Sequence, residues 1–165
     1  MDWSPFLVCA PGETPPGARG IGTPEGLGDR LRTAAFAERQ AREAFRWAAE
    51  TLTDAPPEVR DGWRRLADEE GRHLDMILSR MSQLGVRPEE RPVSDALWRS
   101  LEGCRTAREF AARMKTAEER GKAAEESFRR RLAGTDPATA ALFGAIADDE
   151  AAHIALGERL LAALP

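Results

Sequence analysis

Apolar residues recur along most of the chain at steps of three, four or seven, which is the spacing of one face of an α-helix. This spacing predicts four long helices, over residues 26–53, 57–84 and 106–132, and from 137 nearly to the C-terminus. A short helix is expected within SDALWRSL, inside the longer connection of residues 86–105. No segment has the strict alternation of apolar and polar residues that is typical of a strand.

Capping residues support these helix limits. Thr23 and Asp136 each precede a proline, so each is expected to cap a helix whose first residue is that proline. Thr106 and Glu109 have the spacing of a capping box at the start of the third long helix. Gly85 is a natural stop for the second helix.

The order of these elements predicts an all-α fold. A short turn, a long connection and a second short turn link the four helices, as in a four-helix bundle with one crossover connection. We assign residues 23–165 to this bundle, built from two helix-pair repeats. Residues 1–22 are rich in glycine and proline and lack periodicity, so we expect an extended N-terminal arm that packs on the body or trails from it.

Composition excludes several classes of protein. Cys9 and Cys104 belong to no CxxC pair, so neither a disulfide framework nor a rubredoxin-type or zinc-ribbon site is expected. The formal charge of −4 gives no global basic field to attract nucleic acid or an anionic membrane. The first residues lack the basic segment of a signal peptide, and no apolar run approaches the ~20 residues of a membrane span. We therefore expect a cytoplasmic protein without membrane partners.

An internal repeat becomes visible when the sequence is shifted by 80 positions, because the two halves then align without a gap. The aligned polar pairs are Glu38 with Glu118, Glu70 with Glu150, and His73 with His153. The two glutamates of each half are equally far apart, and each histidine follows the second glutamate by three residues.

The repeated glutamates and histidines are candidate metal ligands. Residues at i and i+3 share a helix face, so each Glu-x-x-His pair points one way, and each pair lies inside an apolar stripe. The two remaining glutamates also interrupt apolar stripes. Four buried carboxylates would repel one another, whereas two divalent cations would cancel their charge. The predicted set is that of a di-metal carboxylate bundle: Glu38, Glu70, His73, Glu118, Glu150 and His153.

Oxygen and nitrogen ligands without thiolates favour iron or manganese over structural zinc. We expect two iron ions, with manganese or a mixed manganese and iron site as alternatives. Glu70 and Glu150 are expected to bridge the ions, and each histidine to bind one ion. Glu38 and Glu118 would then be terminal ligands.

Some assignments near this set stay open. Glu119 or Glu125 could replace Glu118 as the ligand. Glu125 is otherwise assigned to the surface, with a cation entry path as the alternative. Asp148 and Asp149 are expected nearer the helix flanks, where they could contact the ligands from outside or face solvent.

Several sequence motifs within about residues 20–162 resemble those of known families. The segment AERQAREAFRWAA resembles the first ligand helix of rubrerythrins, which would place a ligand at Glu38. RGIGTPEG, DEEGRHLDMILSRMSQLG, SDALW, EERG and DDEAAHIALGERLL resemble an uncharacterised ferritin-like family. That family is related to the hydroxylase that modifies 2-methylthio-isopentenyladenosine in tRNA. The resemblance implies a ferritin-like di-iron protein with the same six ligands.

Three functions are consistent with these features. The first is an oxygen-activating di-iron oxidoreductase, a hydroxylase or oxidase, with dioxygen or peroxide, a small organic substrate and an external electron donor as partners. The second is iron handling, as a ferroxidase or a peroxide scavenger. The third is a metal-stabilised binding module without turnover. The acidic charge disfavours nucleic acid, although the resemblance keeps a tRNA substrate open, and a homodimer also stays open. The chain has no tyrosine, which excludes a tyrosyl-radical role.

Overall fold

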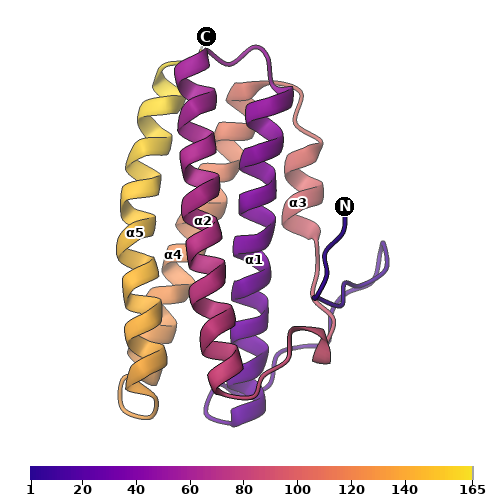
Figure 1. Cartoon of the computed structure of the whole chain (residues 1–165), viewed down its shortest axis with the longest axis vertical. Coiled ribbons are helices and arrows are strands. Elements are labelled where there is room, and N and C mark those ends of the chain that lie inside the picture. The colour runs from indigo at the N-terminus through magenta and orange to yellow at the C-terminus, as the bar shows by residue number, and fades with distance from the viewer. Residues whose placement is uncertain (165) are drawn as a thin grey trace.

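The protein is an all-helical bundle in its computed structural model, which describes residues 1–164 (Figure 1). The long helices are α1 (Pro24–Thr51), α2 (Pro57–Gln83), α4 (Ala107–Leu132) and α5 (Pro137–Ala162). A 3₁₀ turn, η1 (Pro88–Glu90), and a short helix, α3 (Ala96–Glu102), lie in the connection between α2 and α4. Within residues 1–164 there is no strand beyond one isolated bridge. The predicted all-α class is confirmed, and the helix limits agree to within about two residues.

Most of the expected caps are present. The Thr23 hydroxyl accepts from the N–H of Gly26 at 3.0 Å, and Asp136 caps α5 in the same way. Gly85 follows α2 with φ of +68°, a left-handed conformation that glycine adopts without strain. Thr106 caps α4, but the Glu109 carboxylate accepts from the N–H preceding this residue, so the capping box is displaced by one position.

The long helices pack mainly as two pairs, α1 with α2 and α4 with α5, and α2 also packs on α5. The connection between α2 and α4 returns along the outside of the bundle, where α3 lies beside α1 (Figure 1). None of the helices in residues 1–164 is both long and apolar enough to cross a membrane.

The apolar interior consists of two clusters, one on each side of a polar layer. The first, here called the Phe110 cluster, includes Phe45, Trp63, Leu66, Phe110 and Met114. The second, here called the Phe143 cluster, includes Phe36, Leu74, Ile77, Phe143 and Ile146. Along each long helix, a buried glutamate lies between the residues of one cluster and those of the other. The clusters therefore hold the four helices at a fixed distance around these glutamates.

The N-terminal segment packs against the bundle. Phe6 is buried and its ring lies 5.0 Å from that of Phe36. The Cys9 N–H donates to the Val93 carbonyl at 2.9 Å, so the segment also pairs with the connection between α2 and α4. A Cβ atom at Gly26 would lie 1.8 Å from the carbonyl oxygen of Gly20, and only glycine permits this approach.

A buried carboxylate joins this segment to α1 and to the connection. Asp29 accepts from Arg19 at 2.7 and 2.9 Å and from Arg91 at 2.6 Å, and Arg32 lies 3.3 Å away. Hydrogen bonding to Arg19 holds the pKa of Asp29 well below its usual range. Arg32 also donates to Glu90 at 3.1 Å, so the ion pairs tie three separate segments together.

Candidate metal centre

All six candidate ligands are buried in the layer between the two apolar clusters. Their exposed fractions are 1% for Glu70, 2% for His73 and Glu150, 3% for His153, 6% for Glu38 and 8% for Glu118. Acidic side chains are almost never buried to this degree without a compensating charge. Their burial therefore requires cations or protons at the same place.

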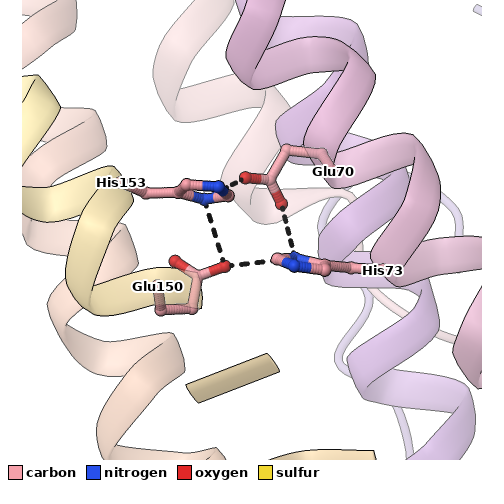
Figure 2. A group of neighbouring side chains, drawn as sticks. All are labelled: Glu70, His73, Glu150 and His153. Atoms are coloured by element: carbon pink, nitrogen blue, oxygen red, sulfur yellow. Dashed lines mark ion pairs between the residues drawn. The ribbon is translucent and has the colours of Figure 1, made fainter. Parts of the chain in front are cut away.

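Four of these side chains form a compact group at the contact of α2 with α5 (Figure 2). One ligand atom from each of Glu70, His73, Glu150 and His153 lies within 4.8 Å of the others. His153 Nδ1 lies 3.0 Å from Glu70 and 3.5 Å from Glu150. His73 Nδ1 lies 3.4 Å from Glu150 and 3.8 Å from Glu70. Each glutamate is thus shared between both histidines, as a bridging carboxylate would be.

The outer two glutamates lie at opposite sides of this group. A Glu38 carboxylate oxygen lies 3.7 Å from His73 Nδ1. Glu118 interacts with Glu150 and lines a small cavity together with His153. The structure therefore brings all six residues to one place, with Glu38 on the His73 side and Glu118 on the His153 side.

Two further carboxylates orient the histidines from outside the group. His73 Nε2 lies 3.2 Å from Asp149, and His153 Nε2 lies 2.6 Å from Glu69. Since an ionised carboxylate only accepts, the proton of a neutral imidazole lies on Nε2, and Nδ1 is left for a metal. Asp149 was a candidate for such a contact, but Glu69 was missed. The 80-position shift aligns Glu69 with Asp149, and this signal could have identified it.

Several atoms of the group lack a hydrogen-bond partner among the described residues. They are Glu70 Oε1, Glu118 Oε1, Glu150 Oε2 and the Nδ1 atoms of His73 and His153. A buried polar atom without a partner costs about 1–3 kcal/mol. All are oxygen or nitrogen donors of the kind that bind iron and manganese, so the residues fit a bound metal.

The carboxyl groups divide into two pairs when no cation is present. Burial raises the pKa of Glu38 and of Glu118 well above the ordinary value and so favours the protonated form of both. Burial also acts on Glu70 and Glu150, but contacts with the histidines and the neighbouring carboxyl groups outweigh it. The pKa of each is therefore lowered, and both are ionised.

The histidines balance these charges. Burial alone would lower the pKa of His73 and His153, but the adjacent carboxylates outweigh it. The pKa of His153 rises to about 10, and that of His73 rises further. Two imidazolium ions then neutralise the two ionised carboxylates. Two divalent cations would neutralise the four carboxylates of the candidate ligand set in the same way.

The structure corrects one assignment and decides another. Glu125 is only 5% exposed, so its predicted surface position is wrong. It follows Glu118 by two helical turns and therefore shares its inward face. Burial, and then the charge of Glu150, raise the pKa of Glu125 to about 8. Glu119 is exposed and pairs with Lys115 at 2.6 Å, so it does not take the place of Glu118.

A cavity of about 20 Å³ adjoins the centre on the His153 side. Its apolar lining comes from Phe45, Trp63, Leu66, Ala111, Met114, Ile154 and Gly157, and Lys115, Glu118 and His153 complete it. This volume holds about one molecule of the size of water. Dioxygen and hydrogen peroxide are little larger, whereas an organic substrate would require the lining to move.

Comparison with known proteins identifies one family, which matches most of the chain. No curated protein matches the sequence. A family model described as a protein of unknown function (DUF455) matches residues 6–164. This match spans the bundle and all six candidate ligands, and the chain therefore belongs to this family.

Proposed function

We propose that the chain is a ferritin-like di-iron carboxylate protein and an oxygen-activating oxidoreductase, a hydroxylase or oxidase of an organic substrate. One observation carries the proposal, namely the buried group of Glu70, His73, Glu150 and His153, whose ligand atoms lie within 4.8 Å of one another. Glu38 and Glu118 lie beside this group and would complete the ligand set.

The arrangement of the helices supports the ferritin-like assignment. Such proteins place one glutamate on each of two helices and a Glu-x-x-His pair on each of the other two. Here α1 and α4 carry the single glutamates, and α2 and α5 carry the pairs. The connection through α3 corresponds to the long crossover of these bundles, and the internal repeat relates the two helix pairs.

The residues define separate roles around the ions. Glu70 and Glu150 would bridge them, and His73 with Glu38 and His153 with Glu118 would each serve one ion. When bound, the ions would supply redox chemistry toward dioxygen or peroxide, with manganese as the alternative to iron. Asp149 and Glu69 fix the imidazole rings by accepting their Nε2 protons. The two apolar clusters exclude bulk water.

Metal content and oxygen uptake test this proposal. Protein reconstituted anaerobically with ferrous iron should hold two ions per chain by elemental analysis, and it should consume dioxygen in an oxygen electrode. Glu70→Gln should abolish stoichiometric binding, because it removes a shared ligand, whereas the exposed Glu119→Gln should not. Two bound irons without dioxygen uptake would contradict an oxygen-activating role, and failure to bind iron or manganese would contradict the metal centre.

A second candidate function is peroxide scavenging or ferroxidase activity. The small cavity beside Glu118 and His153 favours it, because the cavity has room for a diatomic reactant or peroxide but not for an organic substrate. Peroxide consumption that exceeds dioxygen uptake would support this function over the first. The mass of the particle in solution distinguishes ferroxidase activity for iron storage from peroxide scavenging, because iron storage requires a cage of many subunits.

A further inference from the structure

Glu125 is a buried acid that the six-ligand set leaves out. It is 5% exposed, and its Oε2 atom has no hydrogen-bond partner within residues 1–164. The next residue, Glu126, is by contrast only half-buried and lies 3.4 Å from Lys122. An acid that is buried without a partner is costly to the fold, so its position calls for an explanation.

The position of Glu125 on α4 directs it to the metal centre. It lies two helical turns after Glu118, on the same face, and side chains on a helix lean toward its N-terminus. The carboxyl group of Glu125 is therefore directed back toward the level of Glu118. Its strongest electrostatic interactions are with Glu150 and then His73.

The internal repeat points to the same side of the centre. The residue aligned with Glu125 is Phe45, which lines the cavity beside Glu118 and His153. A side chain at this position of α1 thus reaches the edge of the centre on the His153 side. On the His73 side of the centre, the corresponding place lies beside Glu38 and His73, and it is occupied by Glu125.

We propose that Glu125 is a seventh protein ligand of the metal centre, and that it serves the ion held by His73 and Glu38. This inference rests on the proposed function. A cation at this place would provide the partner that the buried oxygen lacks. The two ions would then be unequal, because the ion at His73 would gain a carboxylate while the ion at His153 would face the small cavity.

Cobalt titration of the metal-free protein tests the inference without reference to activity. Wild-type protein should bind two cobalt ions with unequal affinities, followed by calorimetry and by visible absorption, which reports coordination number. Glu125→Gln and Glu125→Leu should weaken the tighter step at least 10-fold, and up to about 100-fold, and change its absorption. The weaker step should be unchanged. Glu126→Gln, at the half-buried neighbour that pairs with Lys122, is the matched control.

The outcomes separate this inference from the proposed function. If wild-type protein binds neither cobalt, manganese nor iron, the proposed function fails. If wild-type protein binds two ions and both Glu125 variants titrate as it does, only the seventh ligand is overturned. Circular dichroism of the metal-free variants checks their folding. Misfolding of both would assign Glu125 a structural role and would overturn the inference as well.

Discussion

The two sides of the centre have equivalent candidate ligands but different surroundings. On the His153 side, Phe45 and Gly157 help to line a cavity of about 20 Å³ that reaches the ligands. On the His73 side, the residues aligned with these two are Glu125 and Ile77, an acid and a bulky apolar residue. Both are buried.

This difference separates the repeated candidate ligands from the residues around them. A glutamate, a Glu-x-x-His pair and an outer carboxylate recur in both halves, as two ions with the same donors would require. The neighbouring positions differ, so one side of the centre adjoins a cavity and the other has an additional buried acid. Two ions bound by nearly symmetric ligands could therefore differ in their surroundings.

Removal of one histidine should have the largest effect on the difference between the two sides. His73→Ala should remove the ion on the Glu125 side and His153→Ala the ion on the cavity side, each with a loss of affinity of about 100-fold or more. Elemental analysis after dialysis should find one ion per chain in each variant. Two ions retained in either variant would show that its histidine is not a ligand.

The carboxylates behind the histidines should have a smaller effect on the same two sites. Asp149→Asn should weaken binding of the ion at His73, and Glu69→Gln binding of the ion at His153, each by about 10- to 100-fold. A neutral amide oxygen accepts the Nε2 proton less strongly than an ionised carboxylate does, so it orients the imidazole less well. Competition with a chelator measures both affinities. Asp148→Asn, at an exposed neighbour, is the control, and an equal effect of all three changes would contradict the assignment.

Glu125→Gln should stabilise the metal-free protein. The pKa of Glu125 is about 8 in the folded protein, against an ordinary value of 4.5. Below pH 4.5 the side chain is neutral in both the folded and the unfolded chain. As the pH rises from 4.5 to about 8 the unfolded chain ionises more readily, so the free energy of unfolding falls. The glutamine side chain does not ionise, so the free energy of unfolding of the variant does not fall for this reason. We expect a gain of about 1–2 kcal/mol at pH 7, because each unit of pKa difference corresponds to about 1.4 kcal/mol and the amide is itself incompletely bonded.

Urea unfolding of the metal-free protein between pH 5 and 9 measures this gain. It should grow with pH up to about 8 and then stay constant, whereas Glu126→Gln should show no such trend. A gain that is independent of pH would mean that burial of the ionised acid is not its cause.

The smallest expected effect concerns two helical glycines. A Cβ atom at Gly157 or at Gly121 would meet no heavy atom within 4 Å, so alanine at either position should stabilise the protein by about 0.5–1 kcal/mol. Only Gly157 lines the cavity. Gly157→Ala should therefore also slow dioxygen uptake by the iron-loaded protein, while Gly121→Ala should not. Thermal unfolding and an oxygen electrode measure the two effects, and equal uptake by both variants would contradict an entry route at the cavity.

The helices and the gathering of the candidate ligands could be predicted because their signals are local. Caps such as Thr23 and Asp136 act within one turn, and the i, i+3 spacing fixes the direction of each Glu-x-x-His pair. The structure brings these residues together as the spacing implies. Their binding of metal stays a prediction.

Other features depend on contacts that no local pattern reports. Glu125 lies on a helix rich in charged residues, and only the packing of the bundle shows which of them are covered. Glu69 is 37% exposed and still reaches His153 on another helix. The pairing of Asp29 with Arg19 and Arg91 joins residues far apart in sequence. Helical periodicity gives the direction of a side chain but not what lies across from it.

The buried Asp29 carboxylate makes the outer layer of the fold behave as one unit. It is shared by arginines from the N-terminal segment, from α1 and from the connection between α2 and α4. If any one of these segments detached, it would leave a charge poorly compensated away from water, and that cost would fall on the other two. The segment and the connection should therefore open and close cooperatively, with a common rate of amide hydrogen exchange, instead of fraying separately as a tail and a loop.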